Sequence, residues 1–102
     1  MQLEDIEHNA EKAADFLKGL ANPHRLIILC KLTEGERSVT ELITLTGIAQ
    51  TSMSQHLSRL KEEQIVTFRR DHRTLYYRIE NEIVMEFMQI MYKHFCQQET
   101  PE

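Results

Sequence analysis

The spacing of hydrophobic residues changes twice along this chain, and these changes restrict the folds that the chain can adopt. Over residues 3–63 the apolar residues recur at spacings of three and four, which is typical of amphipathic helices. Over 65–79 they gather in two β-branched and aromatic segments, and over 81–98 the helical spacing returns. This pattern predicts a fold that is mainly α with a small β-hairpin.

Start and stop signals divide the first helical region. The first helix is predicted over 3–20, and Asn22-Pro23 separates it from the second because proline is favoured in a first helical turn. The stretch Ser38-Val39-Thr40-Glu41 is a capping-box pattern that opens a third helix. Gly47 then permits a tight turn before a fourth helix over about 50–63. Residues 38–63 are therefore predicted to form a helix-turn-helix.

The fourth helix has two distinct faces. One carries apolar residues at helical spacing, namely Met53, Leu57 and Leu60. Another carries side chains that can all form hydrogen bonds, namely Ser52, Gln55, His56 and Arg59. A helix with one packed face and one polar face is suited to recognition of a polar partner.

The β-rich interval predicts a hairpin, or wing, over 65–79. Its arms are 65–70 and 74–79, joined by Asp71-His72-Arg73. Because the joint lacks the Asn-Gly signal of a two-residue turn, we expect a longer, mobile tip.

Together these elements predict a single domain over 1–102, a winged helix-turn-helix of five helices and a two-stranded wing. A chain this short leaves little interior for a substrate pocket, so we do not expect an enzyme. The first and last helices, 3–20 and 81–98, carry apolar stripes that so small a domain cannot fully bury. The stripe residues are Leu3, Ile6, Ala10, Ala13, Leu17 and Leu20 in the first helix and Val84, Phe87, Met88, Met91 and Phe95 in the last. We therefore expect a homodimer with a helical interface formed by these two helices.

The charges are unevenly distributed. The net charge is −4, but residues 50–79 carry six basic and three acidic side chains. Such a segment on an acidic body is suited to a polyanion, and double-stranded DNA is the predicted partner. The DNA-binding residues are predicted to be Gln50, Thr51, Ser52, Ser54, Gln55, His56, Arg59, Arg69, Arg70 and Arg73.

Other features of the sequence argue against a secreted protein, a membrane protein and a protein that binds a metal or a cofactor. The acidic start MQLEDIEH lacks the features of a signal peptide, and no apolar run is long enough to span a membrane, so we expect a cytoplasmic protein. The two cysteines, Cys30 and Cys96, fit no CxxC pattern, and we predict no metal and no cofactor.

Four stretches, in this order and spacing, resemble the ArsR/SmtB family of bacterial repressors: LANPHRLIIL (20–29), SVTEL (38–42), SQHLSRL (54–60) and RRDHRTLYYRI (69–79). The resemblance covers almost the whole chain. It implies a dimer formed by the first and last helices, with the fourth helix in the major groove of a palindromic operator and the hairpin over the flanking backbone or minor groove. Two positions depart from the family pattern: Ala49 stands in place of the usual Ser, and Thr51 in place of the usual Pro.

Within that family the chain is most similar to the sulfur-responsive branch of BigR, SqrR and HlyU, which keeps one cysteine at the end of the second helix and one in the last helix. Cys30 and Cys96 match these positions. The resemblance implies a repressor that responds to reactive sulfur species, persulfide or polysulfide, through a Cys30–Cys96 dithiol switch.

The residues themselves leave competing functions open. A lone cysteine on an apolar helical face is most often a small buried hydrophobe. A metal-responsive repressor would need more converging ligands than Cys96 and His94, and the third helix has Glu41–Thr46 where the metal-sensing branch has ELCVCDL. A redox regulator that uses a simple disulfide also remains open, as does a protein-interaction module that does not bind DNA.

Overall fold

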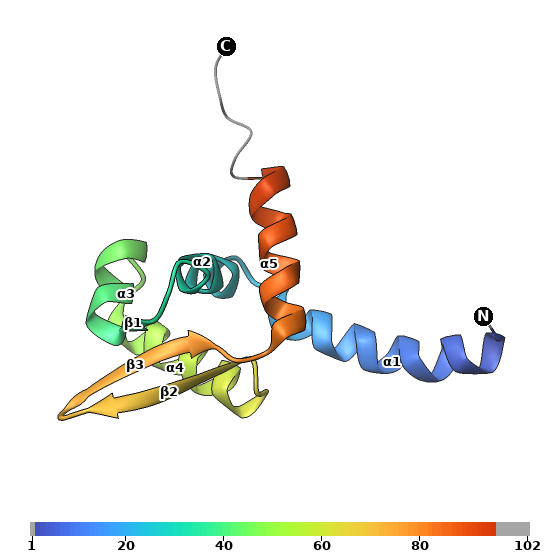
Figure 1. The fold of residues 1–102 in the computed structure, drawn as a ribbon, viewed down its shortest axis with the longest axis horizontal. Helices are drawn as coiled ribbons and strands as arrows, with labels where there is room; N and C mark the ends of the chain where they lie inside the picture. Colours follow the sequence, from blue (N-terminus) through green and yellow to red (C-terminus); the bar gives the residue numbers. More distant parts are fainter. Residues whose placement is uncertain (1, 96–102) are drawn as a thin grey trace, which may run out of the picture.

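The computed structural model describes residues 2–95 as a helical body with a protruding β-hairpin (Figure 1). The elements are, in order, α1 (Leu3–Leu20), α2 (Pro23–Leu32), β1 (Arg37–Ser38), α3 (Val39–Thr46), α4 (Gln50–Glu62), β2 (Val66–Asp71), β3 (Thr74–Ile79) and α5 (Glu82–Phe95). The predicted mainly α winged helix-turn-helix is confirmed. The part of the last helix predicted beyond residue 95 lies outside the described residues.

The junction of α1 and α2 follows from its capping residue. Asn22 Oδ1 accepts hydrogen bonds from the backbone N–H groups of His24 (2.9 Å) and Arg25 (3.2 Å), and Pro23 occupies the first turn. The Arg25 side chain is mostly buried, and its Nη1 donates to the carbonyl oxygen of Gly19 at 2.9 Å. This arginine therefore ties the end of α1 to α2.

The helix-turn-helix forms as its local signals predict. Ser38 Oγ accepts from Glu41 N at 3.1 Å, and Glu41 Oε1 accepts from Ser38 N at 2.8 Å, which completes the capping box. Gly47 ends α3 with φ 78°, a conformation that favours glycine. Leu42 of α3 and three residues of α4 (Met53, Leu57 and Leu60) are buried in the core.

The wing belongs to a three-stranded antiparallel sheet in the order β1-β3-β2. Strand β1 is not predicted from the sequence, and its two residues pair with Tyr77 and Tyr76 of β3. So short a strand has no periodicity of its own and exists because the chain entering α3 lies along β3.

The expectation of a longer hairpin tip is wrong. Asp71 pairs directly with Thr74, so only His72 and Arg73 form the turn. His72 adopts φ 61°, which a tight turn requires and which is uncommon without glycine. Its Nδ1 lies 3.0 Å from Asp71 Oδ1, a local contact that accompanies this conformation.

The first helix has little contact with the body. Figure 1 shows α1 projecting from the remaining elements, and only its last two residues, Gly19 and Leu20, are buried. Its apolar residues Leu3, Ile6 and Leu17 are exposed. No described helix is long and apolar enough to cross a membrane.

Candidate DNA-binding surface and thiol site

The polar face of α4 lies opposite its buried face. With Met53, Leu57 and Leu60 in the core, the side chains of Gln50, Thr51, Ser54, Gln55 and Arg59 are exposed, while Ser52 and His56 are half-buried. The helix begins after Ala49, whose side chain makes no capping hydrogen bond. The first-turn N–H groups of α4 thus donate no hydrogen bond to a capping side chain, whereas in α3 Glu41 N donates to Ser38 Oγ.

His56 is more enclosed than the rest of this face. Its ring meets that of His24 on α2 edge to face, with 5.6 Å between the ring centroids. Burial lowers the pKa of His56, and the positive charge of Arg25, the neighbouring His24 and the charge of Arg59 lower it further. The sequence predicts a DNA contact for His56 but gives no indication of its contact with His24.

A shallow groove separates the start of α4 from the wing. Its volume is about 320 Å³, and its lining includes Gln50 and Ser54 of α4 together with Arg73, Thr74 and Leu75 of the wing. The side chains of Arg70 and Arg73 are exposed and make no ion pair within residues 2–95. The fold therefore brings Arg73 of the wing and the start of α4 to the same groove, and Arg70 is exposed on the same hairpin.

The third predicted arginine of the wing, Arg69, forms an ion pair with an acidic side chain. Its Nε donates to Glu36 Oε1 at 2.9 Å and to Oε2 at 3.2 Å, and its Nη2 donates to Oε1 at 2.6 Å. The guanidinium carbon lies 4.7 Å from the centroid of the Tyr76 ring. Glu36 and Tyr76 were not among the predicted site residues, because the 33-residue separation of Glu36 from Arg69 leaves no local signal.

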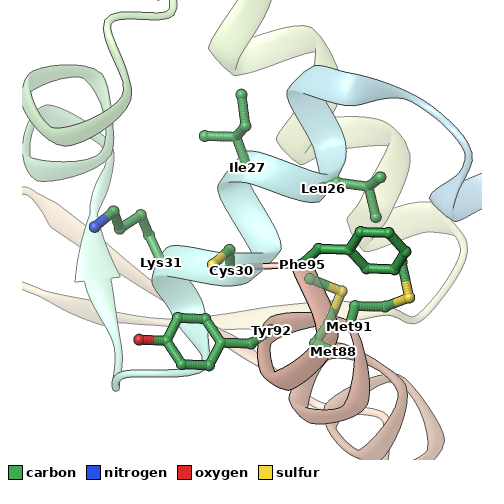
Figure 2. A pocket seen from close by; sticks show the side chains of 8 residues that line it. All are labelled: Leu26, Ile27, Cys30, Lys31, Met88, Met91, Tyr92 and Phe95. Carbon is green, nitrogen blue, oxygen red and sulfur yellow. The ribbon is translucent and has the colours of Figure 1, made fainter. Parts of the chain in front are cut away.

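Cys30 lies in an apolar pocket between α2 and α5. The pocket has a volume of about 380 Å³ (Figure 2), and its lining is Leu26, Ile27, Cys30, Lys31, Met88, Met91, Tyr92 and Phe95. Cys30 itself is half-buried. The other predicted sensor thiol, Cys96, lies outside the described residues.

Apolar side chains are exposed on both terminal helices. On α1 they are Leu3, Ile6 and Leu17, and on α5 they are Ile83, Ile90, Tyr92 and Phe95. The predicted apolar stripe of α5 includes Val84 and Met88, and both are buried in the core. Ile83 and Ile90 were not predicted to be part of it, although their seven-residue spacing is itself a sign of a second apolar stripe on this helix.

Known proteins resemble this chain over nearly its whole length. The family described as bacterial regulatory protein, arsR family, matches residues 22–67. A biofilm growth-associated repressor from Xylella fastidiosa is 40% identical over 99 residues, which are 97% of this chain and 87% of the relative. The transcriptional activator HlyU from Vibrio cholerae is 35% identical over 97 residues, 95% of this chain and 90% of that protein.

Solved structures of related regulators are also similar to this chain. The structure of reduced HlyU from Vibrio cholerae has a TM-score of 0.89 at 35% identity and covers 93% of this chain and 100% of that one. A homodimeric winged helix-turn-helix DNA-binding domain from Mycobacterium bovis has a TM-score of 0.75 at 31% identity, with 99% and 97% covered. These relatives are described as regulators, which confirms the prediction that the chain is not an enzyme. With its predicted fold and motifs matched by these proteins, the chain belongs to the ArsR family of bacterial regulatory proteins.

Proposed function

We propose that this protein is a homodimeric, DNA-binding transcriptional repressor of the cytoplasm that releases its operator when reactive sulfur links Cys30 to Cys96. The observation that carries the DNA-binding part is the groove in which Gln50 and Ser54 of α4 and Arg73 of the wing lie together. Arg70 is exposed on the same wing. The relative from Xylella fastidiosa is named as a repressor and HlyU as an activator, and we favour repression on the higher identity of the former.

The polar face of α4 provides base contacts, and the wing provides phosphate contacts. The side chains of Gln55 and His56 stand near the middle of α4, where a recognition helix meets base edges in the major groove. The exposed Arg70 and Arg73 are suited to the phosphate backbone, which is contacted without regard to sequence. Gln50, Thr51, Ser52, Ser54 and Arg59 complete the proposed surface of α4.

Dimerisation through α1 and α5 is supported by their exposed apolar residues. Ile90 is 57% exposed and Leu3 is 66% exposed, which is unusual for large aliphatic side chains that share one molecule with a closed core. Most of the stability of a helix in a protein comes from the packing of its apolar face, and a second copy supplies the packing that α1 lacks. The Mycobacterium bovis neighbour is described as homodimeric.

The sensor part is supported by the surroundings of Cys30. The thiol lines a pocket between α2 and α5, and Phe95, which precedes Cys96 in the sequence, lines the same pocket. A plain disulfide requires Cα atoms about 4.4–6.8 Å apart, whereas a bridge with an extra sulfur atom spans a longer gap. Two thiols and two sulfane sulfur atoms from a polysulfide yield such a trisulfide, and the second sulfur atom leaves as sulfide.

The proposed link lowers DNA affinity by shifting a population of dimers. It joins α5, a dimerisation helix, to α2, which packs beneath α4 through the contact of His24 with His56. A tether between α2 and α5 therefore changes the spacing of the two recognition helices across the dimer, and disfavours the arrangement that matches the operator.

Selection from random duplexes followed by polysulfide treatment tests the proposal. We expect the wild-type protein to enrich a near-palindrome with half-sites about one helical turn or a multiple apart, and to release it on treatment with polysulfide. Parallel treatment with peroxide and with zinc distinguishes this response from a simple disulfide switch and from a metal response. Absence of any preferred sequence contradicts the repressor function.

A further inference from the structure

Arg69 differs from Arg70 and Arg73 of the wing in the contacts that its guanidinium group makes. Two of its nitrogens, Nε and Nη2, donate to the Glu36 carboxylate, and the third, Nη1, lies 3.9 Å from Asp71 Oδ2. Its guanidinium carbon lies over the ring of Tyr76, 4.7 Å from the centroid. All three nitrogens therefore lie near carboxylates, and the group also makes a cation–π contact.

The contact spans the whole sheet. Arg69 lies on β2 directly opposite Tyr76 of the central strand β3, and Glu36 immediately precedes β1 on the far edge. The side chain of Arg69 thus crosses β3 and joins the chain segment that enters the helix-turn-helix to the outer strand of the wing. The interaction connects residues 33 apart in the sequence, whereas the hairpin by itself connects only β2 to β3, from Asp71–Thr74 out to Val66–Ile79.

We propose that Arg69 is a positioning residue and not a phosphate contact: with Glu36 and Tyr76 it holds the wing at the orientation in which Arg70 and Arg73 meet DNA. This replaces the DNA contact that the sequence predicts for Arg69. It rests on the proposed DNA binding for its functional consequence, but the positioning itself is a property of the free protein.

The strength of the contact favours this role. Isolated surface ion pairs contribute little, but a two-point guanidinium–carboxylate contact within a network of charges is more persistent. The side chains of Glu36 and Arg69 are 33% and 49% exposed, so the pair is only partly screened by water. The hydrogen bond from Arg69 lowers the pKa of Glu36, and nearby Arg78 lowers it further, so the carboxylate stays charged near neutral pH. A phosphate would have to displace this carboxylate to reach Arg69.

Variants that change the geometry and the charge separately test this role. Arg69→Lys keeps the positive charge but cannot form the planar two-point contact with Glu36. Glu36→Gln removes a negative charge near the wing and weakens the same contact. Arg70→Ala is the matched control, because it removes an exposed arginine from the next position of the same strand. Affinity for a mixed-sequence duplex is measured as a function of salt concentration for each full-length variant.

If Arg69 positions the wing, Arg69→Lys and Glu36→Gln each weaken binding, by about threefold to fivefold, the size of a surface ion-pair effect. Both leave the salt dependence as in the wild type. Arg70→Ala instead reduces the salt slope by about one. If Arg69 contacts phosphate, Arg69→Lys binds nearly as well as the wild type and Glu36→Gln binds more tightly. Either of these two results overturns the inference.

Amide hydrogen exchange of the free protein gives a readout that does not depend on DNA. We expect faster exchange in β2 and β3 of Arg69→Lys and Glu36→Gln, with exchange in α2 and α3 unchanged, and no such change in Arg70→Ala. Unchanged exchange in the wing of the first two variants also overturns the inference. If the wild type shows no salt-dependent binding to any duplex, the proposed function fails, and hydrogen exchange alone then decides the role of Arg69.

Discussion

The ring of His56 on α4 meets the ring of His24 on α2 at an interplanar angle of 88°, with 5.6 Å between the centroids. His56 is half-buried and His24 is exposed, and the charges of Arg25 and Arg59 contribute to the lowered pKa of His56. The helix proposed to recognise bases is thereby coupled to α2, which also carries Cys30.

This environment predicts a pH dependence of stability. Because the pKa of His56 is lowered in the folded protein from the ordinary value of 6.5, the unfolded chain binds the proton more readily. The contribution of His56 to the unfolding free energy is therefore fully present above pH 6.5 and is lost as the pH falls through the lower folded pKa. His56→Gln should remove this part of the acid destabilisation.

Chemical denaturation at a series of pH values from about 7.5 down to about 5 measures the effect. His72→Gln is the matched control, since the side chain of His72 is 91% exposed at the wing tip. Its profile separates the effect of the His56 site from that of a His→Gln substitution in general. If the wild type and His56→Gln lose stability identically as the pH falls, His56 is not the source of this pH dependence.

The exposed apolar stripe on α5 predicts a position at which one charged substitution converts the dimer to monomers. Ile90→Glu places a carboxylate in the proposed interface and should convert the protein to a monomer at micromolar concentration. The free energy of dimerisation should become less favourable by about 3–5 kcal/mol if the interface is dry. Ile90 is preferable to Phe87, because Phe87 also packs against the core of its own subunit. Sedimentation or light scattering measures the change.

Gln89→Glu is the control for the preceding variant. It adds the same charge at the adjacent exposed position of α5, and the dimer should persist. A monomeric wild type at these concentrations would remove the basis for the interface.

Contacts to bases and to phosphates predict different losses. Arg70→Ala should weaken binding to all duplexes by a similar factor and lower the salt slope by about one. Gln55→Ala should chiefly weaken binding to the selected operator, by about 1–3 kcal/mol, and should narrow its advantage over random DNA. Titrations of both duplexes at several salt concentrations separate the two effects. Equal losses on both duplexes for Gln55→Ala would show that this side chain does not recognise a base.

Serine variants of the cysteines test the proposed switch. Cys30→Ser and Cys96→Ser should each bind the operator as the reduced wild type does, and neither should release it on polysulfide treatment. Intact-mass spectrometry of the wild type should show added sulfur joining the two residues, with little change under peroxide alone. If the double serine variant still dissociates normally, the cysteines are not the sensor.

Local interactions explain why most of the fold is predictable from the sequence. Asn22, the capping box of Ser38 and Glu41, and Gly47 each act over one helical turn, so they mark the boundaries of α2, α3 and α4 without help from the rest of the chain. The β-branched and aromatic residues of β2 and β3 are likewise a local signal. The local signals also identify the polar face of α4, because Met53, Leu57 and Leu60 determine which side of that helix is buried.

Tertiary structure alone decided the features that join distant residues. The engagement of Arg69 by Glu36, the edge contact of His24 with His56, and the pocket that holds Cys30 between α2 and α5 each depend on packing between separate elements. The sequence by itself determined which residues are apolar, charged or turn-forming, and therefore the order of the helices and the wing. It did not determine which arginine of the wing is occupied by a carboxylate, because a charge has no preferred partner until the folded backbone brings one within hydrogen-bonding distance.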